Sequence, residues 1–203
     1  MKYIIHRGIT SKYNQENSYL AIKKALLDNK SSGVEFDIRL TKDKKIVLSH
    51  NSLIELNNIE NMNYKEIIKN KYLTTLDKVL DIYSNKIFLI DIKTNNNYKT
   101  FIEVLIPVIN KYNNKNIYLA SFNKKLIKQI NTKYKKGIIT LNYHKNKYNF
   151  IITNYKLISN KKLSKIKNKE IFLWTIHNNS ELKEVKNKFN NNKDYYIIKD
   201  KKE

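Results

Sequence analysis

The stretch Gly33-Val34-Glu35-Phe36-Asp37-Ile38-Arg39-Leu40-Thr41 decides the fold. It predicts a strand, and Glu35 and Asp37, two positions apart, then point to the same face. Similar polar groups end three other short apolar runs. They are His6-Arg7-Gly8 after Tyr3-Ile4-Ile5, His50 after Ile46-Val47-Leu48, and Asp91-Ile92-Lys93 after Ile87-Phe88-Leu89-Ile90. In a parallel barrel the carboxyl ends of the strands meet at one mouth, where barrel enzymes hold their active sites. We therefore expect these polar groups to meet there.

Apolar, β-branched segments alternate with segments of helical period along the whole chain. Strands are predicted at residues 2–6, 33–41, 86–93, 117–122, 137–143, 150–154, 171–177 and 195–199, with 46–50 as an extension after the second. Helices are predicted at 18–29, 75–83, 98–112, 124–133 and 180–189, with one short helix within 51–73. Eight strands alternating with helices predict an α/β protein with a (β/α)₈ TIM barrel, and an open α/β sheet is the alternative.

The second half of the predicted barrel is minimal. About six residues separate the strands near 143 and 150, too few for a crossover helix, and the chain ends directly after its last strand. Shortened or missing helices are therefore expected there.

Length and composition favour one domain spanning residues 1–203. No Pro/Gly/Ser-rich linker divides the 203 residues, and the chain has no Cys, which excludes disulfides and thiolate metal ligands. No apolar stretch reaches membrane-spanning length, and Met1-Lys2-Tyr3 leads into a strand instead of a signal peptide. We expect a cytoplasmic protein.

The formal net charge of +22 allows two readings. A large anionic partner is one, and a bias toward Lys, Asn, Ile and Tyr from A/T-rich codons is the other. The lysines are scattered without a dense basic block, so we favour codon bias and expect no dedicated nucleic-acid binding. The charge still predicts attraction of small anionic substrates and a peripheral attraction to anionic membranes.

Only two of the forty basic residues are Arg, at positions 7 and 39. A guanidinium grips phosphate with two parallel hydrogen bonds, which an ammonium cannot do. Arg7, beside His6, is therefore a phosphate-ligand candidate, whereas Arg39 fits a structural ion pair equally well.

The carboxylates predict a metal site. Glu35 and Asp37 on one face would repel each other unless a cation lay between them, and hard oxygen ligands favour Mg²⁺ or Ca²⁺. Asp91 ends another strand and could supply a third carboxylate, while Lys93 shares its face and suits a phosphate oxygen.

Two of the four histidines lie at strand ends. Imidazoles suit both proton transfers of phosphodiester cleavage near neutral pH, so His6 and His50 are the candidate acid–base pair. His144 and His177 lack such a setting and are interpreted as ordinary surface or loop residues.

These residues resemble the glycerophosphodiester phosphodiesterase family. The resemblance covers nearly the whole chain in order and is densest at residues 33–43. It rests on His6-Arg7-Gly8, Glu16-Asn17, Gly33 to Asp43, His50, Thr75 to Leu80, Asp91-Ile92-Lys93, Ser121-Phe122, Trp174-Thr175-Ile176 and Ile197-Ile198-Lys199-Asp200. The last segment looks like a degraded form of the closing Thr-Asp element of the family. Glu16 and Asn17 could equally do no more than cap the first helix.

The resemblance implies a TIM barrel that hydrolyses glycerophosphodiesters to glycerol phosphate and an alcohol. It implies one divalent cation on Glu35, Asp37 and Asp91, with His6 and His50 as the acid–base pair. It further implies Arg7 and Lys93 on the phosphate and Trp174 against the glycerol or head group. Two alternatives stay open: a lysophospholipase D-type activity on lysolipids, and a catalytically weakened barrel that binds phosphate or other anions.

The chain also departs from the family pattern. Asp91 stands where bacterial members usually carry Glu, Asn51 where Asp is usual, Lys44 where Gly is usual, and His177 where Asn is usual. The segment after His50 is shorter than the typical family insertion, and we expect the last helix of the family to be missing.

Overall fold

The structure is a computed structural model and describes residues 2–69, 72–94, 97–113, 115–142, 147–189 and 195–203. Its strands are β1 (Lys2–Thr10), β2 (Gly33–Leu40), β3 (Ile46–Leu48), β4 (Leu53–Ile54), β5 (Asn57–Asn58), β6 (Ile87–Ile92), β7 (Asn116–Ser121), β8 (Lys135–Thr140), β9 (Phe150–Asn154), β10 (Glu170–Ile176) and β11 (Tyr196–Lys202). Its helices are α1 (Tyr19–Leu27), α2 (Tyr64–Ile67), α3 (Leu76–Leu80), α4 (Tyr98–Asn110), α5 (Lys124–Gln129), α6 (Asn160–Ser164) and α7 (Asn179–Lys188), with a 3₁₀ turn, η1 (Ile59–Asn61).

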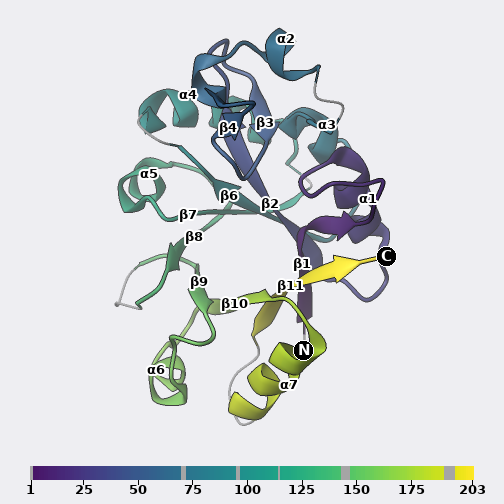
Figure 1. Cartoon of the computed structure of the whole chain (residues 1–203). Coiled ribbons are helices and arrows are strands. Elements are labelled where there is room, and N and C mark those ends of the chain that lie inside the picture. The colour runs from purple at the N-terminus through teal and green to yellow at the C-terminus, as the bar shows by residue number, and fades with distance from the viewer. Residues whose placement is uncertain (1, 70–71, 95–96, 114, 143–146, 190–194) are drawn as a thin grey trace.

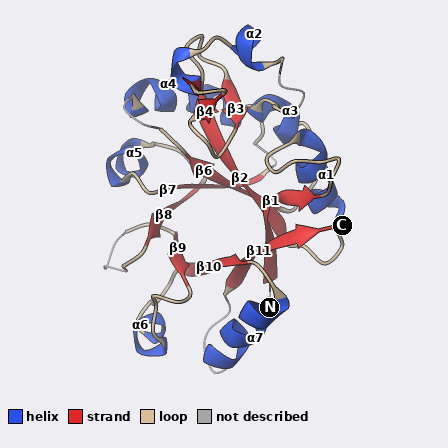
Figure 2. Ribbon diagram, in the orientation of Figure 1, coloured by secondary structure: helices blue, strands red, loops and turns tan. Residues whose placement is uncertain are grey.

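Eight parallel strands close into a barrel. The strand order is β1-β2-β6-β7-β8-β9-β10-β11, and β11 pairs with β1 to complete the ring, which excludes the open sheet. Figure 2 shows the strands as an inner ring with helices around it. β3 pairs antiparallel with β2 beyond the ring, as the predicted extension of that strand.

The predicted thinning of the second half is confirmed. No helix lies in the described part of the β8–β9 connection, and α6, which the sequence analysis did not predict, has only five residues. Only Leu163 of α6 is buried, so no helical period was visible there. The final residue of the predicted strand 137–143 and His144 lie outside the described residues.

Alternate residues of strand β2 face opposite sides of the barrel wall. All eight of its residues are buried. Val34, Phe36 and Ile38 pack in the outer core under the helices, which leaves the alternate residues Glu35 and Asp37 facing the barrel interior.

Aromatic rings fill the barrel interior below the mouth. Phe172 stacks on Tyr196 with ring centroids 4.4 Å apart, and Phe150 lies 5.3 Å from both Phe172 and Tyr118. Gly137 is paired with Phe150 across β8 and β9, where a Cβ atom would lie 2.2 Å from the Phe150 ring. These rings separate the mouth from the lower end of the barrel, where the hydroxyls of Tyr118 and Tyr196 are hydrogen-bonded to Glu170.

The longest helix among the described residues, α4, has 13 residues. None of the described helices combines the length and the apolar character that crossing a bilayer requires.

Candidate active site at the barrel mouth

Strand pairing brings the predicted polar residues together. His6 lies beside Glu35 in the β1–β2 pair, and Asp37 lies beside Asp91 in the β2–β6 pair. A cavity of about 110 Å³ opens at this mouth. Every residue that the sequence analysis assigned to the site lines it: His6, Arg7, Glu35, Asp37, His50, Asp91, Lys93 and Trp174.

The three carboxylates form one buried cluster. One oxygen from each of Glu35, Asp37 and Asp91 lies within 4.8 Å of the others, and the residues are only 6%, 1% and 4% exposed. Burial and the two neighbouring carboxylates raise the pKa of Glu35 well above its usual value. Burial also raises the pKa of Asp91, to about 6. The cluster therefore carries an unfavourable concentration of negative charge, which a bound cation would relieve.

Asp37 is the best-compensated member of the cluster. Its Oδ1 lies 3.2 Å from Nζ of Lys93, and its Oδ2 lies 3.1 Å from Nε of Arg7. Although burial acts to raise the pKa of Asp37, Lys93 and Arg7 hold it below its usual value. Asp37 is thus the carboxylate that stays ionised most readily.

Asn17 supports Asp37 from the β1–α1 loop. Its side-chain amide donates to Oδ2 of Asp37 at 3.0 Å and its Oδ1 accepts from the Asp37 backbone N–H at 3.1 Å. Asn17 has a left-handed backbone conformation (φ 56°), and the helix cap is Ser18, whose hydroxyl accepts from the N–H of Ala21. Of the two readings that the sequence left open for Asn17, contact with the carboxylate cluster is the one observed.

The two arginines have different surroundings. Arg7 lies between Asp37 and Glu16, with Nη1 3.0 Å from the Glu16 carboxylate. Arg39 donates twice to the backbone carbonyl of His50, from Nε at 3.2 Å and from Nη2 at 2.9 Å. Arg39 therefore holds the segment that carries His50, in addition to a longer ion pair with Glu60 at 3.9 Å.

The two histidines lie near different carboxylates of the cluster, His6 near Glu35 and His50 near Asp37. Nε2 of His6 lies 3.9 Å from Glu35, while its Nδ1 lies 2.7 Å from Oδ1 of Asp200. His50 is partly buried, and burial outweighs the nearby Asp37 and lowers its pKa, which favours the uncharged imidazole. Both side chains line the same cavity.

Two aromatic side chains form part of the remaining wall, together with Ile139, Ile152, Thr175 and Ile198. The rings of Trp174 and Phe122 meet edge to face with centroids 5.8 Å apart, and Nζ of Lys93 lies 5.7 Å from the Phe122 ring centroid. The indole N–H of Trp174 has no hydrogen-bond partner among the described residues. Phe122 was not among the predicted site residues, although Ser121-Phe122 was noted in the sequence.

Asp200 and His177 were also outside the predicted site. Each oxygen of Asp200 meets one imidazole, His6 at 2.7 Å and His177 at 2.6 Å. Asp200 directly follows the predicted strand 195–199, the same signal that marked Asp91, but its surrounding motif is degraded, and in the structure it lies within β11. His177 follows β10 and is mostly exposed, in agreement with its interpretation as a surface residue, yet it is tied to the site through Asp200.

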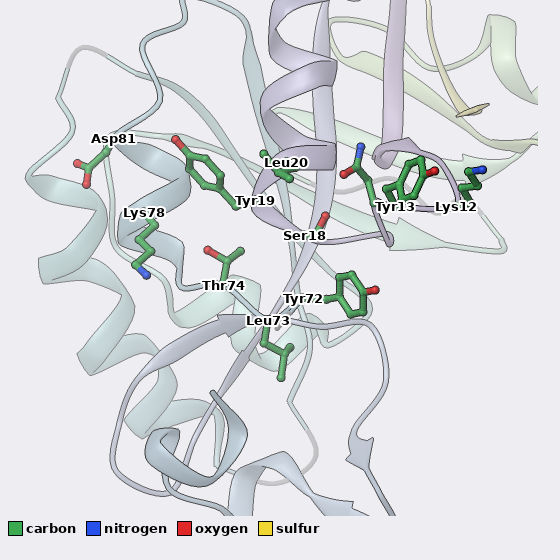
Figure 3. A pocket seen from close by; sticks show the side chains of 11 residues that line it. Lys12, Tyr13, Ser18, Tyr19, Leu20, Tyr72, Leu73, Thr74, Lys78 and Asp81 are labelled. Carbon is green, nitrogen blue, oxygen red and sulfur yellow. The ribbon is translucent and has the colours of Figure 1, made fainter. Parts of the chain in front are cut away.

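A larger hollow lies outside the barrel. Its volume is about 920 Å³, and Figure 3 shows it between the loop around Tyr13, the start of α1 and the segment from Tyr72 to Thr74. Its described lining includes no histidine and a single carboxylate, Asp81, which accepts a hydrogen bond from the hydroxyl of Tyr112 at 2.9 Å. This hollow is larger than the cavity at the mouth, but the candidate acid–base and cation-binding groups lie at the barrel mouth, which is therefore the candidate active site.

The fold and the mouth together define a (β/α)₈ barrel protein that gathers acidic, basic and imidazole side chains in one small cavity. The family model for the glycerophosphoryl diester phosphodiesterase family matches residues 6–190, and the chain belongs to that family. This confirms the resemblance seen in the sequence.

Two curated relatives match part of the chain. A glycerophosphodiester phosphodiesterase of Caldanaerobacter subterraneus is 28% identical over 141 residues, covering 59% of this chain and 57% of the relative. An uncharacterized protein of Mycoplasma genitalium is 26% identical over 162 residues, covering 67% of this chain and 66% of the relative. The match thus spans less than two thirds of the length of either relative.

Solved structures share the fold over nearly the whole chain. A glycerophosphodiester phosphodiesterase from Thermotoga maritima has a TM-score of 0.77 at 23% identity, covering 97% of this chain and 93% of that one. A phosphodiesterase of Oleispira antarctica, in complex with the product sn-glycerol-3-phosphate, has a TM-score of 0.81 at 15% identity, covering 100% and 92%. At these identities the likeness establishes the barrel fold.

Proposed function

We propose that the protein is a metal-dependent glycerophosphodiester phosphodiesterase, which hydrolyses small glycerophosphodiesters to glycerol phosphate and an alcohol. The observation that carries the proposal is the meeting of the Glu35, Asp37 and Asp91 carboxylates with His6 and His50 around one cavity. Carboxylates for a cation and imidazoles for proton transfer are the two requirements of this chemistry.

The donor set fits one Mg²⁺ or Ca²⁺ ion. The three ligand atoms are oxygens at mutual distances that a single cation can bridge, and Oδ1 of Asp91 is buried without a hydrogen-bond partner among the described residues. Glu35, Asp37 and Asp91 would hold the ion. When bound, it supplies positive charge to the phosphoryl oxygens as negative charge develops there.

Arg7 and Lys93 are proposed to bind the phosphate. Nη1 of Arg7 donates to Glu16 and its Nε lies 3.1 Å from Asp37, while no described residue is hydrogen-bonded to Nη2, which is free to donate to a phosphate oxygen. Asp91 and Asp37 raise the pKa of Lys93 despite its burial, so its ammonium stays charged beside the substrate. Both cations stabilise the transition state more than the ground state, because charge on the phosphoryl oxygens grows during the reaction.

His6 and His50 are proposed to divide the proton transfers. One imidazole accepts a proton from the attacking oxygen, which is that of water or of a neighbouring glycerol hydroxyl, and the other donates a proton to the oxygen of the departing alcohol. Attack by the glycerol hydroxyl gives a cyclic phosphate, which water then opens to glycerol phosphate. The lowered pKa of His50 leaves it uncharged at neutral pH, in the form that accepts a proton. Trp174 and Phe122 also line the cavity and would pack against the glycerol or head group.

The net charge of +22 supports a second proposal, about attraction to anionic molecules and surfaces. It would draw small anionic diesters toward the mouth and hold the protein loosely at anionic membranes, in a salt-dependent manner. A cytoplasmic location and a single domain over residues 1–203 also stay predictions from the sequence.

The proposal is tested by following glycerophosphocholine and glycerophosphoethanolamine by ³¹P NMR with Mg²⁺, Ca²⁺ or chelator. We expect glycerol phosphate to appear with a divalent cation, and to vanish with chelator or in a Glu35→Gln/Asp37→Asn variant. Glu184→Gln, which alters an exposed carboxylate on α7, is the matched control and should keep full activity. No turnover by the folded protein with either cation would contradict the proposal, and turnover of lysophosphatidylcholine alone would replace it with the lysolipid alternative.

A further inference from the structure

Asp200 joins two imidazoles that are far apart in sequence. Its Oδ1 lies 2.7 Å from Nδ1 of His6 on β1, and its Oδ2 lies 2.6 Å from Nδ1 of His177 after β10. The closure of the barrel produces this contact, because β11 pairs with both β1 and β10 (Figure 1). Both oxygens of the carboxylate are thereby engaged.

The ionisation of Asp200 determines which nitrogen of His6 carries the proton. Burial acts to raise the pKa of Asp200, but hydrogen bonds and charge from His6 and His177 lower it to about 2. An ionised carboxylate only accepts hydrogen bonds, so Nδ1 of His6 must be the protonated nitrogen. The unprotonated Nε2 of neutral His6 then points toward Glu35, 3.9 Å away, at the catalytic cavity.

His177 is anchored independently of the cavity. Its backbone N–H donates to Oε2 of Glu181 at 2.8 Å, and Oε1 of Glu181 lies 3.1 Å from Nζ of Lys156. The side chain of His177 is 59% exposed, and neither His177 nor Asp200 is among the described residues that line the catalytic cavity. Among the described residues, the side-chain contact that links His177 to the site is the one with Asp200.

We propose that Asp200 is a positioning residue that fixes the tautomer and orientation of His6, and that His177 holds Asp200 in place by engaging its second oxygen. The catalytic consequence rests on the proposed function, whereas the tautomer itself does not. A carboxylate that orients an imidazole in this way preserves the nitrogen that exchanges protons with the substrate.

The tautomer is tested directly by NMR. The chain has four histidines, so two-bond ¹H–¹⁵N correlations of protein labelled with ¹⁵N-histidine are few and can be assigned with single His variants. At pH 8 we expect His6 to carry its proton on Nδ1 in the wild type, and Asp200→Ala to shift it toward Nε2. Protonation of His6 on Nε2 in the wild type, or an unchanged His6 pattern in Asp200→Ala, would overturn the proposal.

Kinetics test the catalytic consequence. We expect Asp200→Ala to lower kcat by about 100-fold with KM within about twofold, as for a misaligned general acid or base. His177→Ala should lower kcat by up to about tenfold, the effect of one hydrogen bond. His177→Asn, which restores an N–H donor toward Oδ2, should recover most of that loss.

Asp28→Asn is the matched control. It removes an ion pair of 2.7 Å with Lys201, the neighbour of Asp200 on β11, without touching His6, and should leave kcat unchanged. Wild-type kcat in Asp200→Ala, or failure of His177→Asn to recover, would contradict the positioning roles. If the wild type shows no turnover, the proposed function fails, while the NMR result still decides the tautomer.

Discussion

Nζ of Lys93 lies 2.6 Å from Oδ2 of Asp91, two positions back along the chain at the end of β6. The ammonium also reaches Asp37 at 3.2 Å, so it neutralises part of the carboxylate cluster. Burial nevertheless raises the pKa of Asp91 from 3.8 to about 6, against the lowering effect of Lys93. Full ionisation of the cluster is therefore unfavourable without a further cation. We expect the stability of the protein to depend on pH and on bound metal for this reason.

We predict that Asp91 makes the metal-free protein less stable as pH rises through about 6. Burial raises the pKa of Asp91 in the folded protein, so its protonated side chain stabilises the fold. This stabilisation is fully present below pH 3.8, the pKa of Asp91 in the unfolded chain, and is lost above about pH 6. Asp91→Asn has no carboxyl group to titrate at this position. The free energy of unfolding of the variant, minus that of the wild type, should therefore increase by about 1 kcal/mol between pH 5 and pH 8. Urea unfolding of both proteins with chelator measures this change, and a difference independent of pH would contradict it.

Arg39→Lys should lower both stability and activity, although we do not place Arg39 in contact with substrate. Two hydrogen bonds from Arg39 hold the His50 carbonyl, and a lysine ammonium cannot reproduce that fork. We expect a loss of about 1 kcal/mol in the free energy of unfolding, from the hydrogen-bond geometry that is lost. We also expect a lower kcat, because the imidazole of His50 moves with its backbone. Denaturant unfolding and steady-state kinetics check both, and a wild-type kcat would show that Arg39 does not position His50.

Gly8→Ala should be strongly destabilising. Gly8 has φ +90°, and a Cβ atom there would lie 2.5 Å from the backbone carbon of Ala21 on α1. Backbone strain and the clash with the backbone of α1 should together lower the free energy of unfolding by about 3 kcal/mol. Thermal or urea unfolding measures the loss. Adding Ala21→Gly should not restore stability, since the backbone contact remains, and recovery in that double variant would show that the Ala21 side chain is the obstacle.

Trp174→Ala should weaken substrate binding more than chemistry. The indole lines the cavity in edge-to-face contact with Phe122, and it offers no carboxylate, ammonium or imidazole group to the reaction. We expect KM for glycerophosphocholine to rise about tenfold, equivalent to 1.4 kcal/mol of lost contact, with Trp174→Phe intermediate. Steady-state kinetics separates KM from kcat, and an unchanged KM would remove Trp174 from the substrate wall.

The barrel and most of the mouth could be predicted from the sequence for a common reason. Parallel strands place their carboxyl ends at one edge, so Glu35, Asp37 and Asp91 had to converge once the strands were recognised. The strand period of two also placed Lys93 on the face of Asp91. These inferences needed only local patterns.

Contacts made by barrel closure were harder to predict. Asp200 and His6 are 194 positions apart, and only the pairing of the last strand with the first brings them together. The fork of Arg39 on the His50 carbonyl likewise depends on how the segment after β3 returns over β2. No periodicity in the sequence encodes either contact.

The most direct test of the central claim is the stoichiometry of the cation. Calorimetric titration of metal-free protein with Mg²⁺ or Ca²⁺, alongside diesterase turnover at each addition, measures binding and activity together. We predict one bound ion per chain, turnover that rises in proportion to occupancy, and loss of both in Asp37→Asn. Full turnover without bound cation, or binding that persists in Asp37→Asn, would contradict a single metal centre on Glu35, Asp37 and Asp91.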